Sequence, residues 1–253
     1  MMSEPLLVVD RLTKTFAGIN ALENFSCSVM DEEVVALVGP NGAGKTTLFN
    51  ILTGLLRPDS GNAAYSGTTL VGKTPHKIAQ LGIARTFQNV RLIRQLSACD
   101  NVVLASGRQL GEELLPALAR WSRCEKVDRA CRERAMGILE TIGLKTYSNS
   151  LAGVLSYGQQ KLLCLAMCVA SNARLLLLDE PVAGAALSIR DKVLSLVRAM
   201  RANGHSVMMI EHDMQAVASL ADRVVFMDAG KRVCEGTVDE VRCDPRVMQA
   251  YLE

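Results

Sequence analysis

The sequence lacks several features that would place it in whole classes of protein. Its 253 residues contain no apolar run near the ~18 needed to span a bilayer, the longest being Leu162–Ala170. The formal net charge of +2 gives no reason to expect a nucleic-acid-binding surface. The first residues, Met1 to Pro5, lack the basic start and apolar stretch of a secretory signal. We therefore expect a cytoplasmic chain whose role at a membrane, if it has one, depends on a partner.

The cysteines form no recognisable metal or redox motif. There is no Cys-x-x-Cys pair, and although Cys164 and Cys168 are one helical turn apart, no nearby His or acidic cluster completes a metal site. Reduced and mostly buried thiols are expected at Cys27, Cys99, Cys124, Cys131, Cys164, Cys168, Cys234 and Cys243.

Short β-like runs alternate with helical segments along the chain, which is typical of an α/β fold with a mostly parallel sheet covered by helices. Uninterrupted apolar runs predict strands buried on both faces at Val34–Val38, Ile83–Phe87, Leu175–Leu178 and Val207–Ile210. A small N-terminal antiparallel sheet is expected from Leu6–Val9 and Asn62–Tyr65. From about Leu92 to Ala152 the residues favour helix, which predicts a helical subdomain inserted into the core.

A glycine-rich motif follows the first buried strand. Residues 39–46 read Gly-Pro-Asn-Gly-Ala-Gly-Lys-Thr and fit G-x-x-x-x-G-K-[ST] at every required position. The motif opens a helical segment, Thr46–Thr53, which Gly54 can cap. Such a loop points successive N–H groups at phosphate oxygens, and the helix start adds partial positive charge. The alternative is a glycine-rich turn with an exposed lysine.

Two side chains of this motif have chemical roles beyond the backbone. Lys45 supplies a cation for terminal phosphates, and the hydroxyl of Thr46 can ligate magnesium. The residues expected to bind the nucleotide here are Gly39, Pro40, Asn41, Gly42, Ala43, Gly44, Lys45, Thr46 and Thr47.

Polar side chains follow three of the predicted strands. In parallel sheets, ligands bind beyond the carboxyl ends of the strands. Asp179 is placed to hold magnesium, directly or through water, and Glu180 to polarise the attacking water as general base. His212 could reach the terminal phosphate, and Gln88 could touch both magnesium and water. Each signal is weak alone, but together with the phosphate loop they predict a nucleoside-triphosphate site.

A second anion-binding helix start is expected at residues 155–160, Leu-Ser-Tyr-Gly-Gln-Gln. Ser156 and Gln159 have the spacing of a capping box, which alone would indicate a helix start and nothing more. Gly158 in the first turn costs helix propensity but permits close approach of a ligand. A helix start with unpaired N–H groups and a Ser hydroxyl binds anions.

This hexapeptide resembles the signature motif of ABC nucleotide-binding domains, usually Leu-Ser-Gly-Gly-Gln, with Tyr157 replacing the first glycine. The order of phosphate loop, Gln88, signature, Leu-Leu-Leu-Leu-Asp-Glu and His212 is similar to that family over essentially the whole chain. The resemblance implies a P-loop NTPase ABC cassette with a RecA-like core. It implies a single domain, 1–253, with the β subdomain and core at 6–91 and 171–253 and the helical subdomain at about 92–170.

The resemblance also implies ATP and Mg²⁺ as cofactors and a head-to-tail pair of ATP-binding subunits. The signature residues Ser156, Gly158 and Gln159 of one subunit would cap the ATP on the phosphate loop of the second. Phe16 matches the aromatic residue that stacks on adenine, although alone it would be read as a core aromatic. Whether the pair is a homodimer or a heterodimer stays open.

Longer stretches, including residues 82–92, 210–214 and 244–252, are similar to the longer ATP-binding subunit of branched-chain amino-acid importers. That similarity implies two permeases and a sister ATP-binding subunit as partners, with a solute-binding protein engaged indirectly. The chain would then lie peripherally on the cytoplasmic face of the membrane. The region Gln88–Val103 would dock on the permease.

The sequence departs from the family at two places. Ala186 stands where the family usually has Asn or Asp after Asp-Glu-Pro, and Met167 stands where it often has Arg. Our hypothesis is that Ala186 weakens coupling between the two sites of the dimer. Restoring Asn at 186 should then raise ATP turnover, and an unchanged rate in the assembled transporter would rule this out.

Three other functions compete with an amino-acid importer subunit. They are an ABC subunit of another transporter such as a lipopolysaccharide exporter, a soluble ATP-dependent regulator, and a nucleotide-binding scaffold without turnover. Co-purification with an integral membrane protein separates transport from the soluble functions. A Glu180→Gln variant that binds ATP but stops phosphate release separates an enzyme from a scaffold.

Overall fold

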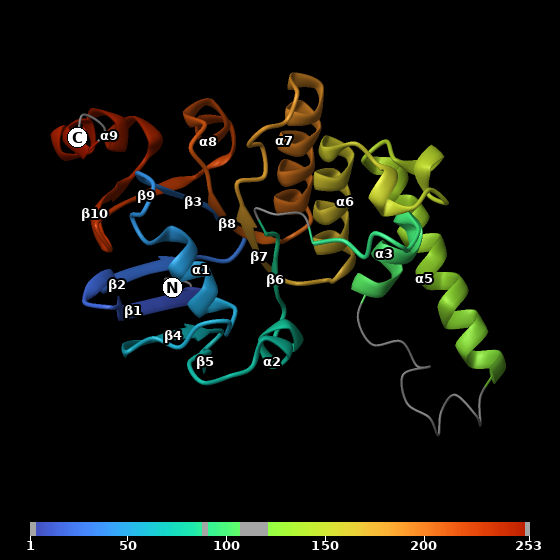
Figure 1. The fold of residues 1–253 in the computed structure, drawn as a ribbon, viewed down its shortest axis with the longest axis horizontal. Coiled ribbons are helices and arrows are strands. Elements are labelled where there is room, and N and C mark those ends of the chain that lie inside the picture. Colours follow the sequence, from blue (N-terminus) through green and yellow to red (C-terminus); the bar gives the residue numbers. More distant parts are fainter. Residues whose placement is uncertain (1–3, 88–90, 107–120, 251–253) are drawn as a thin grey trace. The chain divides into compact units, whose positions relative to one another are not determined.

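The computed structural model describes residues 4–87, 91–106 and 121–250 and separates into two compact units (Figure 1). The first unit comprises residues 1–85, 173–183 and 197–253, and the second comprises 86–172 and 184–196. The second unit thus includes residues 86–91, 171–172 and 184–196, which the sequence had assigned to the core. Within the described ranges, no helix is both long and apolar enough to cross a membrane.

The first unit contains a four-stranded antiparallel sheet in the order β2-β1-β4-β5. Its strands are β1 (Leu7–Phe16), β2 (Ile19–Val29), β4 (Ser60–Tyr65) and β5 (Thr68–Thr69). The predicted small antiparallel sheet is confirmed. Strand β1 continues well past its predicted end at Val9, because β2 pairs with it from Leu7 through to Phe16.

The second sheet of this unit has the order β10-β9-β3-β8-β7-β6. Its strands are β3 (Val34–Val38), β6 (Ile83–Arg85), β7 (Leu175–Asp179), β8 (Ser206–Ile210), β9 (Arg223–Asp228) and β10 (Lys231–Gly236). Neighbours from β9 to β6 are parallel, whereas β10 is antiparallel to β9. Every residue of β3, β7 and β8 is buried, as expected for central strands covered on both faces.

The predicted strand Ile83–Phe87 is wrong at its end. Strand β6 stops at Arg85, which pairs with Leu177, and Thr86 and Phe87 lie beyond it. The reason is that β6 is the edge of the sheet and is held by β7 alone, so pairing on one side decides its length.

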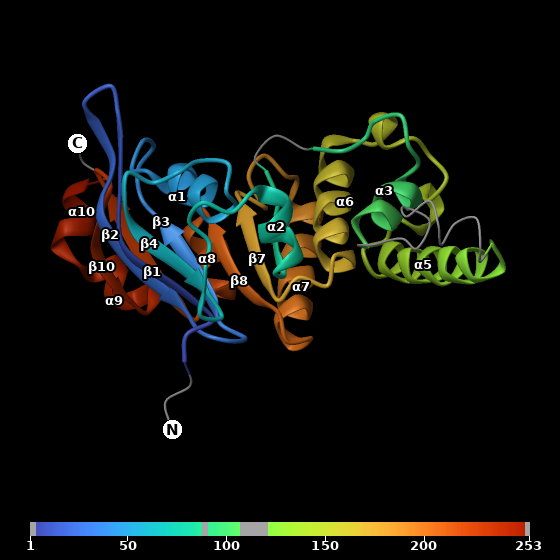
Figure 2. The ribbon, with the colours of Figure 1, turned by 90° about the horizontal axis from the view of Figure 1, so that it is seen from below.

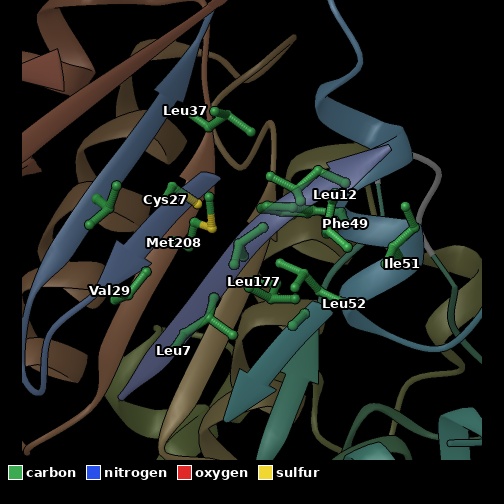
Figure 3. Packing of buried hydrophobic residues seen from close by; sticks show 14 of the residues in the cluster. Leu7, Leu12, Cys27, Val29, Leu37, Phe49, Ile51, Leu52, Leu177 and Met208 are labelled. Atoms are coloured by element: carbon green, nitrogen blue, oxygen red, sulfur yellow. The ribbon is translucent and has the colours of Figure 1, made fainter. Parts of the chain in front are cut away.

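The two sheets of the first unit share one hydrophobic core with helix α1 (Lys45–Leu52). Figure 2 shows β1, β2 and β4 alongside β3, and Figure 3 shows Leu12, Phe49 and Met208 pointing into this core. Full burial of such a side chain contributes about 1.5–3 kcal/mol. The core therefore fixes α1 against the sheet. Other helices described in this unit are α2 (Pro75–Gln80), α8 (Met214–Leu220), α9 (Val238–Cys243) and α10 (Pro245–Ala250).

The second unit is helical, as predicted. It contains α3 (Ala98–Ala105), α5 (Trp121–Thr141), two 3₁₀ turns (Lys145–Tyr147 and Ala152–Val154), α6 (Tyr157–Ala170) and the first part of α7 (Leu187–Ala202). The segments before α3 and α6 are joined by the backbone bridge between Ser97 and Leu151.

The expectation of mostly buried thiols is wrong for several of the described cysteines. Cys27, Cys99 and Cys168 are buried, but Cys131, Cys164 and Cys234 are only half-buried and Cys243 is exposed. These four cysteines are less buried because they lie on faces of α5, α6, β10 and α9 that reach solvent. Burial raises the pKa of Cys27 and of Cys168 to about 12, so both stay protonated at neutral pH. Cys124 lies outside the described side chains.

Candidate functional site

The glycine-rich loop connects β3 to α1, and two of its glycines are required by the surrounding backbone. A Cβ on Gly39 would lie 1.9 Å from the carbonyl oxygen of Met227. Gly44 has φ +105°, and a Cβ there would lie 2.2 Å from the carbonyl oxygen of Ala21. Helix α1 begins at this loop with no side-chain cap. Its first N–H groups therefore need an acceptor from outside the helix, such as an anion.

Lys45, the first residue of α1, folds back over the loop. Its side chain is buried, and Nζ donates to the carbonyl oxygens of Gly39 at 2.7 Å and Pro40 at 2.8 Å. Burial lowers the pKa of Lys45, and the nearby carboxylates of Glu180 and Asp179 oppose that effect. Phosphate oxygens carry more negative charge than carbonyl oxygens, so this ammonium can exchange its present acceptors for phosphate.

The end of β7 brings two carboxylates to the same place. Asp179 is the last residue of the strand and is buried. Glu180 follows with φ +49°, a backbone conformation that is costly for a residue with a side chain and is concentrated at functional sites. Its Oε1 lies 3.4 Å from Nε2 of His212, which follows β8. The structure thus brings together Asp179, Glu180 and His212, three of the predicted site residues.

Glu211 is a residue that the sequence analysis missed. Its carboxylate is buried and accepts the backbone N–H of Val182 at 2.9 Å and that of His212 at 3.2 Å. It therefore ties the turn after Glu180 to the end of β8. The available signal was an acidic residue directly after an apolar strand. The sequence analysis instead gave a role to the neighbouring His212.

Arg85 was also missed, although it lies inside the predicted strand Ile83–Phe87. Its NH2 lies 3.0 Å from Oδ2 of Asp179, and its NH1 lies 2.7 Å from Oδ1 of Asn50. Both side chains of the ion pair are only 4% exposed. A charge in a strand expected to be buried needs a partner, and that was the signal for a carboxylate on the next strand.

Some of the other predicted contacts of this unit reach its surface, whereas Ala43 is buried. Phe16, at the end of β1, is 46% exposed, with Nζ of Lys14 5.4 Å from its ring centre. That exposure contradicts the core-aromatic alternative and leaves a ring face for stacking. Asn41 and Thr46 are also exposed at the loop. Gln88 lies outside the described residues.

In the helical unit, the predicted capping box is formed. Helix α6 begins after Ser156, whose hydroxyl accepts the N–H of Gln159 while the Gln159 side chain accepts the N–H of Ser156 at 2.9 Å. The helix start is exposed at Ser156 and Tyr157.

Gly158 has a structural role that the sequence did not indicate. A Cβ on Gly158 would lie 2.9 Å from Cγ1 of Ile189 on α7. Packing against α7 therefore accounts for the glycine independently of any ligand. Ala186, which stands where the family usually has Asn or Asp, lies at the start of α7. Its carbonyl accepts the N–H groups of Ile189 and Arg190. Ala186 thus caps this helix without a side-chain acceptor. Met167 is half-buried within α6.

Comparison with known proteins places these features in one family. A family model described as ABC transporter matches residues 22–183, and one described as branched-chain amino acid ATP-binding cassette transporter matches residues 231–252.

Full-length relatives share the same description. The chain is 39% identical over 252 residues to the high-affinity branched-chain amino acid transport ATP-binding protein BraF of Pseudomonas aeruginosa, covering 99% of each chain. It is 38% identical over 253 residues to the high-affinity branched-chain amino acid transport ATP-binding protein LivG of Salmonella typhimurium, again covering 99% of each. Among solved structures, a nucleotide-free ATP-binding cassette from an ABC transporter superposes with a TM-score of 0.84 at 29% identity, covering 99% of this chain and 100% of that one.

Proposed function

Because this chain belongs to the ABC transporter family as an ATP-binding cassette, we propose that it hydrolyses ATP to drive import of branched-chain amino acids. The observation that carries the proposal is the position of Lys45. It lies on the phosphate loop where the charges of Glu180 and Asp179 act on it. The functions named for the relatives BraF and LivG support branched-chain amino acids as the class of solute.

ATP would bind with its phosphates in the loop of residues 39–47 and its adenine on the exposed ring of Phe16. Lys45 would release the carbonyls of Gly39 and Pro40 and donate to the terminal phosphates instead. The N–H groups at the start of α1 would add further donors, since no side chain caps that helix.

Hydrolysis follows from the groups at the ends of β7 and β8. Glu180 would accept a proton from the attacking water while an oxygen–phosphorus bond forms at the terminal phosphorus. The bond to the bridging oxygen then breaks, releasing ADP and phosphate. His212, whose Nε2 lies 3.4 Å from Oε1 of Glu180, would form a hydrogen bond with the terminal phosphate. Gln88 would orient the water, as the sequence predicts.

The residues present also fit a magnesium ion. Thr46 contributes a hydroxyl and Asp179 a carboxylate, the hard oxygen donors that Mg²⁺ prefers. The carboxylate is held in place by Arg85, and the hydroxyl lies at an exposed position of the loop. Gln88 would add an amide oxygen. When bound, Mg²⁺ neutralises the negative charge of the phosphates.

A second ATP-binding subunit would complete the site. The Ser156, Gly158 and Gln159 tip of α6 from one subunit would meet the phosphates on the loop of the other. Exposure of this helix start supports the arrangement. A homodimer and a mixed pair both fit these residues.

The permease partner would bind exposed apolar residues of the helical unit. Ile93 and Leu151 are each 49% exposed, and Val154 is 74% exposed. These residues lie on adjacent segments, since Gly153 donates its N–H to the carbonyl of Arg94. Apolar residues exposed together are typical of a protein interface. The chain would then lie on the cytoplasmic face of the membrane, with the solute-binding protein reached only through the permease.

The test is Glu180→Gln in the transporter reconstituted with its permease. We expect ATP affinity within about threefold of wild type and a fall in phosphate release of roughly 10²–10⁴-fold, since a general base contributes that much. Glu140→Gln, which changes an exposed residue paired with Lys145, is the matched control. Undiminished phosphate release in Glu180→Gln would refute the assignment, and absence of labelled leucine uptake by wild type would refute the solute.

A further inference from the structure

Arg85 lies between two elements of the nucleotide site. It is the last residue of β6, and its guanidinium contacts Asp179 at the end of β7 and Asn50 in α1. NH1 also lies 3.3 Å from Oγ1 of Thr53, and the guanidinium carbon is 5.5 Å from the ring centre of Phe49. The fork is therefore fixed by several contacts.

Burial makes this contact directional. Arg85 and Asp179 are each 4% exposed, so little water competes for their hydrogen bond. A guanidinium is planar and always charged. Because NH1 of Arg85 is held by Asn50, NH2 can point in one direction only. That nitrogen meets Oδ2 of Asp179 at 3.0 Å. The orientation of the carboxylate is thereby set from α1, the helix that also carries Lys45 and Thr46.

We propose that Arg85 is a positioning residue for the metal site, holding Asp179 through Oδ2 in the orientation that Mg²⁺ or its bound water requires. The inference rests on the proposed function, because it assumes that Asp179 serves the metal. A carboxylate has about four lone-pair positions, so an arginine at one oxygen is compatible with a metal or water at the carboxylate. Outer residues that orient a ligand in this way contribute substantially to metal affinity.

The experiment measures metal binding without turnover. Mn²⁺ is titrated into the purified chain saturated with ADP, and loss of the free Mn²⁺ signal is followed by electron paramagnetic resonance. ADP affinity is measured separately in EDTA. In Arg85→Met we expect Mn²⁺ affinity to fall about tenfold and ADP affinity in EDTA to stay within about twofold. Arg85→Lys, which keeps the charge but loses the fork, should recover part of the loss.

Two further variants keep the test decisive. Asn50→Ala leaves the buried ion pair in place and removes its anchor, so it should weaken Mn²⁺ binding by about threefold even if Arg85→Met does not fold. Arg174→Met is the control, because it also removes an arginine paired with an aspartate. Arg174 lies just before β7, and its Nε is 2.9 Å from Oδ1 of Asp31. This variant should leave Mn²⁺ affinity unchanged.

The outcomes separate the two proposals. Unchanged Mn²⁺ affinity in folded Arg85→Met or in Asn50→Ala would overturn the positioning role. An equal loss of ADP affinity in EDTA would also overturn it, because it would indicate general damage to the site. Failure of wild type to bind ADP at all would instead count against the proposed function.

Discussion

Two helix starts in this molecule carry the predicted anion sites, and they satisfy their unpaired N–H groups differently. Helix α1 begins after Gly44, in a left-handed conformation and without a side-chain cap. Helix α6 begins after Ser156 and has both hydrogen bonds of a capping box with Gln159. One start therefore needs an outside acceptor, and the other already has one.

This difference indicates that the two motifs contribute differently to nucleotide binding. The start of α1, with Lys45 beside it, is arranged to bind phosphate by itself. At the start of α6, an anion must compete with the hydroxyl of Ser156 for the same N–H group. We therefore expect the phosphate loop to supply most of the affinity for ATP and the signature to act only when a second subunit presents its nucleotide.

Removal of Lys45 gives the largest expected effect. We expect Lys45→Ala to lower ATP turnover by about 10²–10³-fold, the loss typical of a preorganised electrostatic donor. Turnover and ATP affinity are measured together by phosphate release and calorimetry. Lys77→Ala, at an exposed position of α2, is the control. If Lys45→Ala bound ATP as tightly as wild type, the phosphate loop would not be the main source of affinity.

The second prediction concerns backbone shape at the start of α1. Gly44→Ala should lower the free energy of unfolding by about 3 kcal/mol, because the left-handed φ is strained for alanine and its Cβ would clash with the carbonyl of Ala21. Urea unfolding measures the change. Gly42→Ala is a useful control, since its φ is also positive but no atom lies within 4 Å of the added Cβ. Equal losses would show that strain alone, not the close contact, determines the cost.

At the start of α6 the corresponding glycine should behave differently. Gly158→Ala should cost about 1 kcal/mol, because overpacking against Ile189 exceeds the gain in helix propensity. In an Ile189→Ala background the same change should become neutral or stabilising. Turnover of the double variant in the assembled transporter then tests the ligand role. Lost turnover despite restored stability would mean that Gly158 is needed at the nucleotide as well.

The smallest effect is expected for the cap itself. Ser156→Ala should reduce the free energy of unfolding by about 1 kcal/mol, the usual contribution of an N-cap. Isolated subunits should bind ATP unchanged, whereas turnover of the assembled pair should fall. Ser156→Asp keeps the cap but adds negative charge, so it should restore stability without restoring turnover. Normal turnover in both variants would remove the signature from the site.

Much of the fold and part of the site could be predicted because their signals are local. The phosphate loop, the capping box and the acidic end of β7 are each encoded within a few consecutive residues. The strands β3, β7 and β8 were predicted because burial on both faces requires an unbroken apolar run. The end of β6 was wrong because pairing with a distant strand decides it.

The sequence by itself determined which residues carry charge and where the phosphate loop and the capping box lie, since these are properties of single residues and short motifs. Only the tertiary structure decided which of these groups meet. Arg85 reaches Asp179 and Asn50, Glu211 holds the turn after Glu180, and Ile189 lies against Gly158. Each of these contacts joins residues far apart in the chain, and their geometry comes from the packing of the elements that carry them.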